Sequence, residues 1–380
     1  MRVLYIITKS EFGGAQTHVY QLSKYFIERG DKVAIMSYPG GWLEEKARKL
    51  GIKFYSSSFF SNIPDPIRIF KAIKEIRKVV KDFNPDLVGC HSTAAGFLGR
   101  LAIRNKIPTT FTAHGWAFTE GTSFFRKQLA VLIEKIGGKF CSKIICVSDF
   151  DRKLALKYKI ASPDKLTVIH NGVEVTQINI ESKPKSPEKI IKIVFVGRLA
   201  KPKDPLLLLK SFNNLSPELK GQVNVFIIGD GPKRGELEKF IKGNRLEEKV
   251  KLLGEMPREK VLGFLRKSDI FVLISNWEGF PYTIIEAMSF GLAIIASDVG
   301  GIKEALSGNC GILVKKGDKE GIKNALEKLL KNPSLIIKIG ERAKKKVRKE
   351  FSLEKMLENT AEVYSQLVSI KRFVYKQLNF

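Results

Sequence analysis

The chain has 380 residues, of which 44% are hydrophobic and 28% are charged, and its formal net charge is +27. This length predicts two domains of roughly 150 to 200 residues, and the composition excludes a disordered, collagen-like or disulfide-stapled protein. No apolar run approaches the roughly 20 residues that cross a bilayer, and residues 3–7 are too short an apolar run for a signal-peptide core.

Short apolar runs alternate with helix-patterned segments through the first half of the chain. Runs rich in β-branched residues, without polar alternation, are typical of parallel strands that are covered on both faces. The predicted strands are residues 3–7, 33–36, 87–90, 109–112 and 144–147, with helices at 15–29 and 67–82. This βαβ rhythm predicts a doubly wound α/β sheet.

The rhythm restarts after a polar stretch at residues 178–189, whose two prolines, two serines and lack of an apolar period predict a linker. We therefore expect an N-terminal domain over 1–177 and a C-terminal domain over 190–354. Strands are predicted at 191–196, 223–228, 270–274, 293–296 and 312–314, with helices at 204–213, 234–242, 259–267, 282–289 and 320–330. In such folds ligands bind at the carboxyl ends of the strands, so the cleft between two Rossmann-like domains is the expected site.

Two glycines, Gly13 and Gly14, follow the first predicted strand and precede a helix. A backbone without side chains can approach a ligand closely, and the free N–H groups of a helix start attract an anion. An ordinary tight turn fits this segment equally well, because no G-x-G-x-x-G fingerprint is present.

In the second half, Arg198 and Lys203 follow the strand at 191–196. Two cations at the carboxyl end of a strand can pair with a diphosphate, although in so basic a chain they could also be ordinary solvent-exposed surface residues. Further on, Glu278 precedes a predicted helix start at Pro281, and Glu286 lies on that helix. Spacing alone does not exclude the acid/base pair of a glycoside hydrolase. The nearby cations favour carboxylates that bind sugar or ribose hydroxyls beside a phosphate.

The motifs in this order resemble the retaining family-four glycosyltransferases of GT-B fold over nearly the whole chain. The resemblance rests on the Gly-Gly loop, on His114-Gly115 after a strand, on Asn171-Gly172-Val173, on Gly197-Arg198 with Lys203, and on Glu278 and Glu286 separated by seven residues. The chain departs from the family at Gln16, where Glu is commoner, and at Asp204, where Gly often stands.

The resemblance implies a nucleotide-sugar donor, with UDP as the default base, held mainly by the C-terminal domain. Arg198 and Lys203 would neutralise the leaving diphosphate, Glu286 would bind the ribose, Glu278 would hold the sugar, and His114 would line the sugar. The donor-binding set would be Gly13, Gly14, Arg198, Lys203, Glu278, Gly279, Phe280, Pro281, Tyr282, Thr283 and Glu286. It also implies retention of configuration, no metal and no cofactor, and a C-terminal helix over about 355–380 that returns to the N-terminal domain.

Three other features have competing interpretations. Asp149-Phe150-Asp151 spells the D-x-D of metal-dependent glycosyltransferases, but Ser148 and Asp151 also form a helix capping box. His18, His91 and His170 lack ligand-like spacing and are expected to be structural, with His91 a minor candidate for the acceptor side. The basic amphipathic segments 67–82 and 124–140 are either ordinary cover helices or a docking face for anionic lipid headgroups.

These observations predict a cytoplasmic glycosyltransferase, peripherally associated with the inner face of the membrane, that builds a lipid-linked oligosaccharide or cell-surface polysaccharide. Four dispersed cysteines without a C-x-x-C pair fit a reducing compartment. A UDP-sugar epimerase of the same fold is the alternative enzyme. A nucleic-acid-binding protein, suggested only by the net charge, ranks last because no nucleic-acid motif is present, and we expect no nucleic-acid partner.

Overall fold

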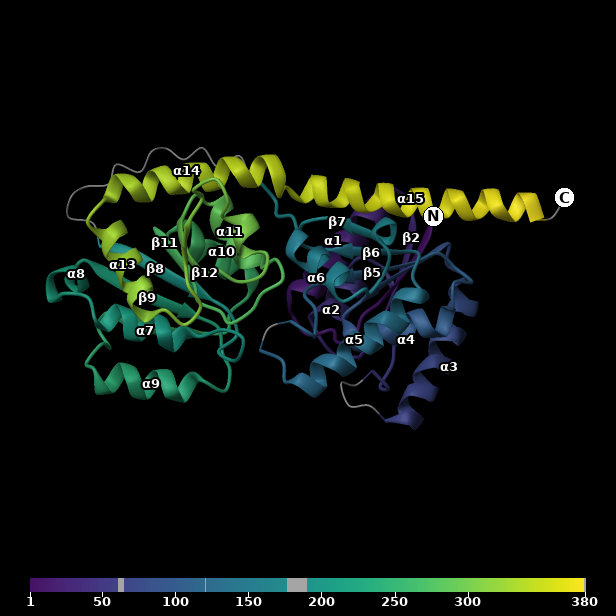
Figure 1. Ribbon diagram of the computed structural model, residues 1–380, viewed down its shortest axis with the longest axis horizontal. Coiled ribbons are helices and arrows are strands. Elements are labelled where there is room, and N and C mark those ends of the chain that lie inside the picture. The colour runs from purple at the N-terminus through teal and green to yellow at the C-terminus, as the bar shows by residue number, and fades with distance from the viewer. Residues whose placement is uncertain (61–64, 120, 176–189, 379–380) are drawn as a thin grey trace. The chain divides into compact units, whose positions relative to one another are not determined.

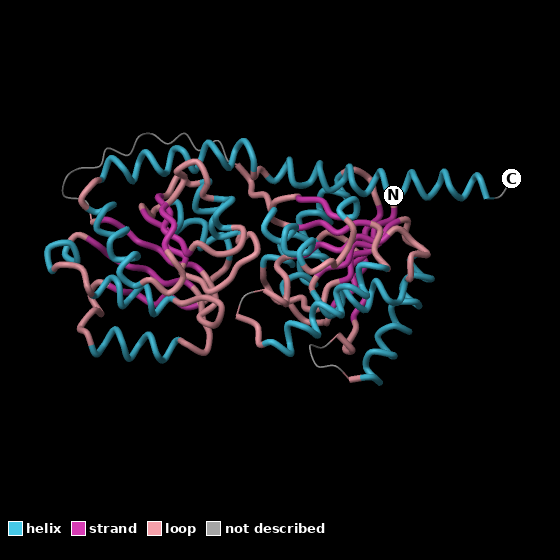
Figure 2. The backbone as a smooth tube through the Cα atoms, in the orientation of Figure 1, coloured by secondary structure: helices cyan, strands magenta, loops and turns pink. Residues whose placement is uncertain are grey.

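The computed structural model describes residues 1–60, 65–119, 121–175 and 190–378, which divide into two compact units. Unit 1 comprises Met1–Asn171 and Glu354–Phe380, and unit 2 comprises Gly172–Leu353. Each unit has its own β-sheet between layers of helices, as Figures 1 and 2 show.

The sheet of unit 1 has seven parallel strands in the order β3-β2-β1-β4-β5-β6-β7. The strands are β1 (Arg2–Ile6), β2 (Lys32–Ser37), β3 (Lys53–Ser56), β4 (Leu87–His91), β5 (Thr109–Ala113), β6 (Lys143–Cys146) and β7 (Leu166–Val168). The chain first builds outward from β1 to β3 and then returns to β4 on the other side of β1. The strand order therefore reverses between β1 and β4, which is the switch point where open α/β sheets bind ligands.

The helices of unit 1 begin where the sequence supplies caps. They are α1 (Gly14–Glu28), α2 (Trp42–Lys49), α3 (Pro66–Phe83), α4 (Thr93–Ile103), α5 (Phe124–Lys139), α6 (Asp149–Lys157) and α15 (Leu353–Leu378), with a 3₁₀ turn at Pro163–Lys165. Asp65 caps α3 ahead of Pro66, and the Ser148 hydroxyl accepts a hydrogen bond from the Asp151 backbone N–H at the start of α6. The capping-box interpretation of Ser148 and Asp151 is confirmed.

Unit 1 also buries an ion pair within its helix layer. Arg100 on α4 and Glu134 on α5 approach to 2.7 Å, and both side chains are excluded from solvent. The Arg100 guanidinium also lies 4.0 Å from the ring centroid of Phe111 and donates to the Gly96 carbonyl. Gly137 faces this guanidinium so closely that a Cβ there would lie 2.6 Å from Arg100 Cζ. The pair links α4 to α5.

The sheet of unit 2 repeats the strand order of unit 1 with six parallel strands, β10-β9-β8-β11-β12-β13. The strands are β8 (Ile191–Val196), β9 (Val223–Ile228), β10 (Val250–Gly254), β11 (Ile270–Leu273), β12 (Ala293–Ser297) and β13 (Ile312–Val314). The four central strands, β9, β8, β11 and β12, carry most of the buried apolar side chains of the sheet. The switch point of unit 2 lies between β8 and β11.

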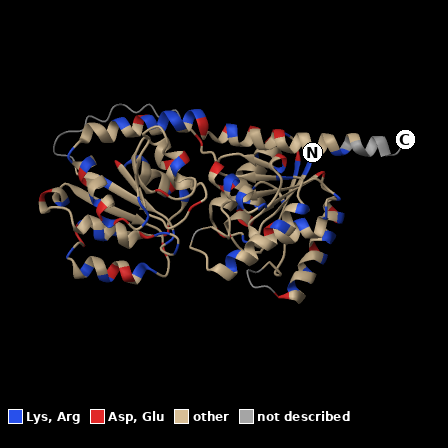
Figure 3. Ribbon diagram, viewed as in Figure 1, with Lys and Arg blue, Asp and Glu red and all other residues tan. Residues whose placement is uncertain are grey.

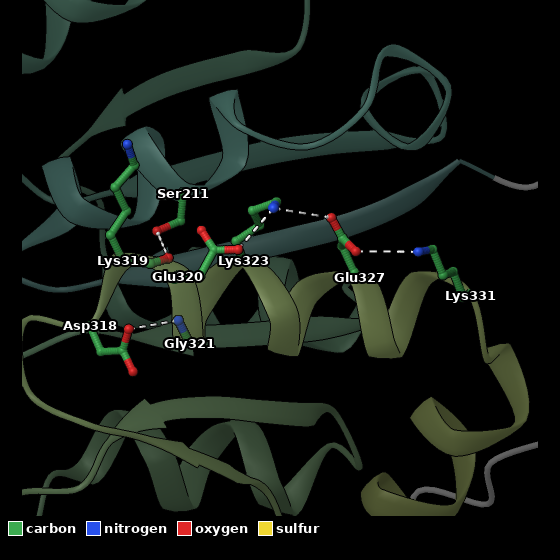
Figure 4. A network of polar contacts seen from close by, with 8 residues as sticks. All are labelled: Ser211, Asp318, Lys319, Glu320, Gly321, Lys323, Glu327 and Lys331. Carbon is green, nitrogen blue, oxygen red and sulfur yellow. Dashed lines mark hydrogen bonds and ion pairs between the residues drawn. The ribbon is translucent and has the colours of Figure 1, made fainter.

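Eight helices in the described part of unit 2 cover its sheet. They are α7 (Pro205–Asn213), α8 (Pro217–Gly221), α9 (Arg234–Gly243), α10 (Arg258–Arg266), α11 (Tyr282–Ser289), α12 (Ile302–Ala305), α13 (Lys319–Leu330) and α14 (Pro333–Glu350). Figure 4 shows how α13 is held. Asp318 accepts from the Gly321 N–H at its start, Ser211 of α7 donates to the Lys319 carbonyl, and Lys323, Glu327 and Lys331 form ion pairs along its surface.

The structure confirms two doubly wound parallel sheets and contains every strand that the sequence predicted. Unit 1 ends at Asn171 rather than at the predicted residue 177, because the Val173 N–H bonds to the Phe351 carbonyl and the Leu353 N–H bonds to the Val173 carbonyl. The predicted linker, 178–189, lies outside the described residues. The four cysteines are buried and free. In the described residues, no helix combines the length and apolarity needed to cross a membrane.

The last helix, α15, belongs to unit 1 from Glu354 onward. Its Tyr364 ring stacks on Phe26 of α1 at a centroid distance of 5.6 Å, and Lys371 donates to the Lys106 carbonyl. Gly89 on β4 lies where this helix and Tyr5 converge, since a Cβ there would be 2.8 Å from the Tyr5 ring and 3.0 Å from Tyr364 Oη. Residues at both ends of the chain thus complete one core.

Candidate active site

The loops that follow β8 and β11 lie side by side at the switch point of unit 2. The Asp204 N–H donates to the Ile274 carbonyl, and the Asn276 N–H donates to the Pro202 carbonyl. These bonds hold Lys203 next to the loop of residues 275–281. Because β8 and β11 are adjacent parallel strands, residues 75 positions apart in the chain meet at one edge.

Lys203 and Glu278, both predicted from the sequence, form an ion pair between Nζ and Oε1 at this edge. The side chains are only 15% and 10% exposed, so the pair is shielded from most of the solvent. Arg198, on the same loop as Lys203, is exposed. One cation is therefore already paired with a carboxylate, while the other faces solvent and can meet an incoming anion.

The loop that carries Glu278 ends at the start of α11. Pro281 stands at the N-cap and no side chain caps the first turn. The Thr283 hydroxyl is buried and has no hydrogen-bond partner among the described residues. Behind the loop, Gly300 has φ +56°, and a Cβ there would lie 1.8 Å from the Glu278 carbonyl oxygen, so only glycine fits. An uncapped helix start beside cations suits a phosphate.

Glu286 lies on α11 and is buried against Arg258 at the start of α10. Arg258 Nη2 and Glu286 Oε1 are 2.6 Å apart. Burial raises the pKa of Glu286 above its ordinary value, and the Arg258 charge opposes that rise. Arg258 therefore favours the carboxylate form of Glu286, which can accept hydrogen bonds from hydroxyl groups. Nothing in the sequence around Arg258 indicates this contact, because it joins two helices 28 positions apart.

At the switch point of unit 1, the loop after β1 carries Gly13 and Gly14. Gly13 is the N-cap of α1, and its carbonyl accepts from the Thr17 N–H. A Cβ at Gly13 would lie 2.7 Å from Gln16 Oε1, so the Gln16 side chain folds over this loop. His114 follows β5 directly and is half-buried. The predicted residues of unit 1 thus lie at the carboxyl edge of its sheet.

Three histidines gather at that edge, although their sequence spacing gave no sign of it. The ring centroids of His18, His91 and His114 lie between 5.0 and 5.7 Å apart. His91 Nδ1 is 3.1 Å from His114 Nε2, and His18 Nδ1 is 3.2 Å from Asn171 Oδ1. His18 and His91 were expected to be structural. Both are fully buried, and both pack against His114.

In the described part of the chain, no group of three or more His, Cys, Asp or Glu side chains is arranged to hold a metal ion. The arrangement can instead neutralise a diphosphate with fixed cations and accept hydrogen bonds with two carboxylates. The predicted residues are divided between the two units. Unit 2 contains Arg198, Lys203, Glu278 and Glu286 with the 279–283 loop, and unit 1 contains Gly13, Gly14 and His114.

Comparison with protein families decides the class. The Glycosyltransferase Family 4 model matches residues 12–177, and the model of the glycosyl transferases group 1 matches residues 176–346. The chain belongs to the glycosyltransferases. This confirms the family predicted from the Gly-Gly, His-Gly and Glu-x₇-Glu motifs.

Several curated glycosyltransferases are similar in sequence. An Escherichia coli UDP-Gal:alpha-D-GlcNAc-diphosphoundecaprenol alpha-1,3-galactosyltransferase is 29% identical over 80% of this chain and 81% of that enzyme. The E. coli O-antigen biosynthesis glycosyltransferase WbnH is also 29% identical, over 83% of this chain and 86% of its own. An uncharacterised glycosyltransferase of Methanocaldococcus jannaschii is 27% identical over 94% of this chain and 96% of that protein.

Solved structures share the fold along the whole chain. A glycosyltransferase from Rickettsia africae has a TM-score of 0.78 at 24% identity, covering 97% of this glycosyltransferase and 98% of that chain. The Anabaena protein HepE, solved in complex with UDP and glucose, has a TM-score of 0.79 at 20% identity, covering 96% and 99% of the two chains. The predicted GT-B fold class is confirmed.

Proposed function

We propose that this glycosyltransferase moves a sugar from a UDP-linked donor to a hydroxyl group of a lipid-linked or polysaccharide acceptor, with retention of configuration. The observation that carries the proposal is the shielded Lys203–Glu278 pair at the switch point of unit 2, beside Arg198 and the uncapped start of α11. The sequence similarity to the galactosyltransferase that uses UDP-Gal and the fold shared with HepE support UDP as the base.

The chemistry follows from where charge changes during transfer. As the bond between the sugar and the diphosphate breaks, the diphosphate gains negative charge and the sugar becomes cation-like. Arg198 and Lys203 stabilise the negative charge on the diphosphate, and the Glu278 carboxylate stabilises the cation-like sugar. The N–H groups at the start of α11 add a partial positive charge. We propose that these groups let the enzyme work without a metal ion or a cofactor.

The other predicted residues contact the substrates at the carboxyl edges of the two sheets. Glu286, kept in its carboxylate form by Arg258, accepts hydrogen bonds from the ribose hydroxyls. The Gly279–Thr283 backbone and the Thr283 hydroxyl contact the donor sugar and phosphate. Gly13, Gly14 and His114 contact substrate at the carboxyl edge of the unit 1 sheet.

The acceptor side has a surface that suits an anionic membrane. On α5, Phe124, Phe125, Leu129 and Leu132 are exposed, Phe125 by 85%, and on α3 Ile67 and Phe70 are exposed. Lysines and arginines flank these residues on both helices (Figure 3). Both helices begin at the carboxyl edge of the parallel sheet, where His114 lies. We propose that this α3–α5 surface docks peripherally on anionic lipid at the cytoplasmic face of the membrane, beside a lipid-linked acceptor.

Incubation with a panel of UDP- and GDP-sugars and an undecaprenyl-diphosphate-linked sugar tests the reaction. We expect transfer from a UDP-sugar in the presence of EDTA, and an α-linked donor should give an α-linked product by NMR. An inverted product would overturn retention, and strict dependence on added Mg²⁺ or Mn²⁺ would overturn metal independence. Release of an altered free sugar without acceptor would favour the epimerase instead.

Vesicle flotation tests the α3–α5 surface. The protein should float with vesicles that contain phosphatidylglycerol and stay behind with pure phosphatidylcholine, since each basic residue near an anionic surface contributes about 1 kcal/mol. Replacing Phe124 and Phe125 together by serine should abolish flotation. Ile337→Ser, which changes an exposed apolar residue of unit 2, is the matched control and should float normally. Equal loss in both variants would contradict the assignment.

A further inference from the structure

His91 and His114 are joined by a hydrogen bond between ring nitrogens. His91 Nδ1 lies 3.1 Å from His114 Nε2, and the two rings are nearly parallel, with an interplanar angle of 25°. His91 is fully buried, whereas His114 is half-buried. In the described part of the chain, this is the only hydrogen bond of the His114 ring, so His114 Nδ1 has no partner there.

Both rings are neutral at physiological pH. Burial lowers the pKa of His91 well below its ordinary value, and the neighbouring His114 and His18 lower it further. Burial also lowers the pKa of His114, with His18 adding to the effect. A neutral imidazole carries one N–H and one lone pair. The bond between His91 and His114 therefore contains one proton, and its position fixes the tautomer of both rings.

The buried end of His91 favours one arrangement. His91 Nε2 has no hydrogen-bond partner among the described residues. If His114 donated to His91, the proton of His91 would have to lie on Nε2, as a buried N–H without an acceptor. Buried N–H groups without partners are rarer than buried acceptors without partners. The alternative, in which His91 Nδ1–H donates, places the single His114 proton on Nδ1, the ring nitrogen that has no partner among the described residues.

We infer that His91 is a positioning residue for His114: it orients the His114 ring and holds its proton on Nδ1, so that His114 presents a hydrogen-bond donor to substrate. This inference rests on the proposed function, in which His114 contacts substrate. It assigns His114 the role of a neutral donor and excludes it as a general base at Nδ1.

The surroundings of His91 fix it in place. Ser92 has φ +59°, and its hydroxyl donates to the His91 carbonyl at 2.6 Å. The same hydroxyl lies 2.7 Å from the Thr8 hydroxyl and accepts from the Thr8 N–H, which ties the end of β4 to the end of β1. The Tyr5 ring packs on His91 from within the core. A rigid partner of this kind can hold the His114 ring to one orientation.

Nitrogen NMR of the unmodified protein tests the tautomer directly. The chain has four histidines, so a ¹⁵N-histidine-labelled sample and single variants at His18, His91 and His114 assign every ring. We expect His114 with a protonated Nδ1 and an unprotonated Nε2, and His91 likewise. In His91→Leu, His114 should lose this fixed pattern and exchange between tautomers. A protonated His114 Nε2 in the wild-type protein would overturn the inference.

Kinetics separates positioning from mere stability. His91→Leu should lower kcat about 10- to 100-fold with a smaller change in the KM of the donor, as expected for a misplaced group. His91→Asn, whose amide can occupy the place of Nδ1, should restore most of kcat. Tyr5→Phe, an equally buried change that leaves the His91–His114 bond intact, is the control and should be near wild type.

Failure of the inference about His91 and failure of the proposed function give different results. If His91→Leu keeps wild-type kcat while His114→Leu loses activity, then His91 does not position His114 and the proposed function stands. If His114→Leu keeps wild-type activity, the assignment of His114 in the proposed function fails, whatever its tautomer.

Discussion

The two units share one strand order but place different chemistry at the switch point. In unit 2 the loops after β8 and β11 bring together cations and carboxylates, namely the Lys203–Glu278 pair, with the Arg258–Glu286 pair on α10 and α11 nearby. In unit 1 the loop after β1 carries glycines, and uncharged histidine rings from the end of β4 and the loop after β5 pack together. The fully buried Arg100–Glu134 ion pair of unit 1 lies in the helix layer instead.

This difference shows that topology fixes where a site forms and the loop residues fix what it can do. Charged groups held at the edge of unit 2 suit a leaving group that gains charge. Neutral rings at the edge of unit 1 suit hydrogen bonds to hydroxyl groups. The buried ion pair of unit 1 should therefore matter for stability, while the shielded pairs of unit 2 should matter for donor binding and turnover.

We expect the largest effect from a substitution that breaks the buried Arg100–Glu134 ion pair of unit 1. Glu134→Ala leaves the Arg100 guanidinium buried without its counter-charge, which should destabilise the protein by about 3–5 kcal/mol. Urea unfolding measures the change. Lys331→Ala, which removes an exposed partner of Glu327 on α13, should cost less than about 0.5 kcal/mol. Similar losses in both variants would remove the distinction between the two kinds of pair.

The second effect concerns turnover in unit 2. Lys203→Ala and Glu278→Ala should each lower kcat about 100- to 1000-fold, because each removes a charge that stabilises the transition state. Circular dichroism should show that both variants are folded. Lys239→Ala makes the same charge change on the exposed surface of α9 and should leave kcat unchanged. Wild-type kcat in Lys203→Ala would remove Lys203 from the site.

The third effect follows from the buried histidines of unit 1. Burial lowers the pKa of His18 from 6.5 to about 4, so between these values the unfolded chain binds a proton that the folded chain does not. Stability should therefore be complete above about pH 6.5 and fall as the pH drops toward 4, by about 3 kcal/mol from this group. His18→Leu should flatten this dependence in denaturant titrations. An unchanged slope would contradict the buried, neutral state of His18.

The smallest effect sharpens the role of Arg258. Arg258→Ala leaves Glu286 buried without its cation, so its pKa should rise further and its carboxylate should accept ribose hydroxyls less well. UDP affinity should fall about 10- to 100-fold, measured by calorimetry, with a recovery at higher pH. Arg258→Lys should keep most of the affinity, and Lys260→Ala on the same helix should change nothing. Full affinity in Arg258→Ala would detach Arg258 from donor binding.

Sequence alone predicted the central strands of both sheets and missed three edge strands. β3 and β7 are the two edges of unit 1, and β10 is one edge of unit 2. β3 has no buried residue and β10 only one, because an edge strand is covered less than a central one. Their apolar patterns are therefore short, and in β10 Lys251 interrupts the pattern. An apolar run is a signal of burial on both faces, and an edge strand carries it less often, although the edge strand β13 was predicted from its run of three apolar residues.

The candidate site was also predicted only in part. Lys203, Glu278 and Glu286 belong to a motif whose order along the chain is informative, so the sequence predicted them as site residues. Arg258 and the gathering of His18 and His91 around His114 depend on contacts between segments far apart in sequence. Isolated residues of this kind belong to no motif with a recognisable spacing. Only the folded arrangement of loops and helices shows that they contact the predicted site residues.

The discontinuity of unit 1 has a consequence for biosynthesis. Unit 2 is one continuous segment and can fold as soon as it has left the ribosome, but unit 1 needs α15 to cover Phe26 and to bring Tyr364 beside Gly89. The half of the protein that is translated first should therefore mature last. A chain that stops before α15 would leave this core exposed to aggregation or proteolysis. Resistance to both should therefore appear only once α15 has been synthesised.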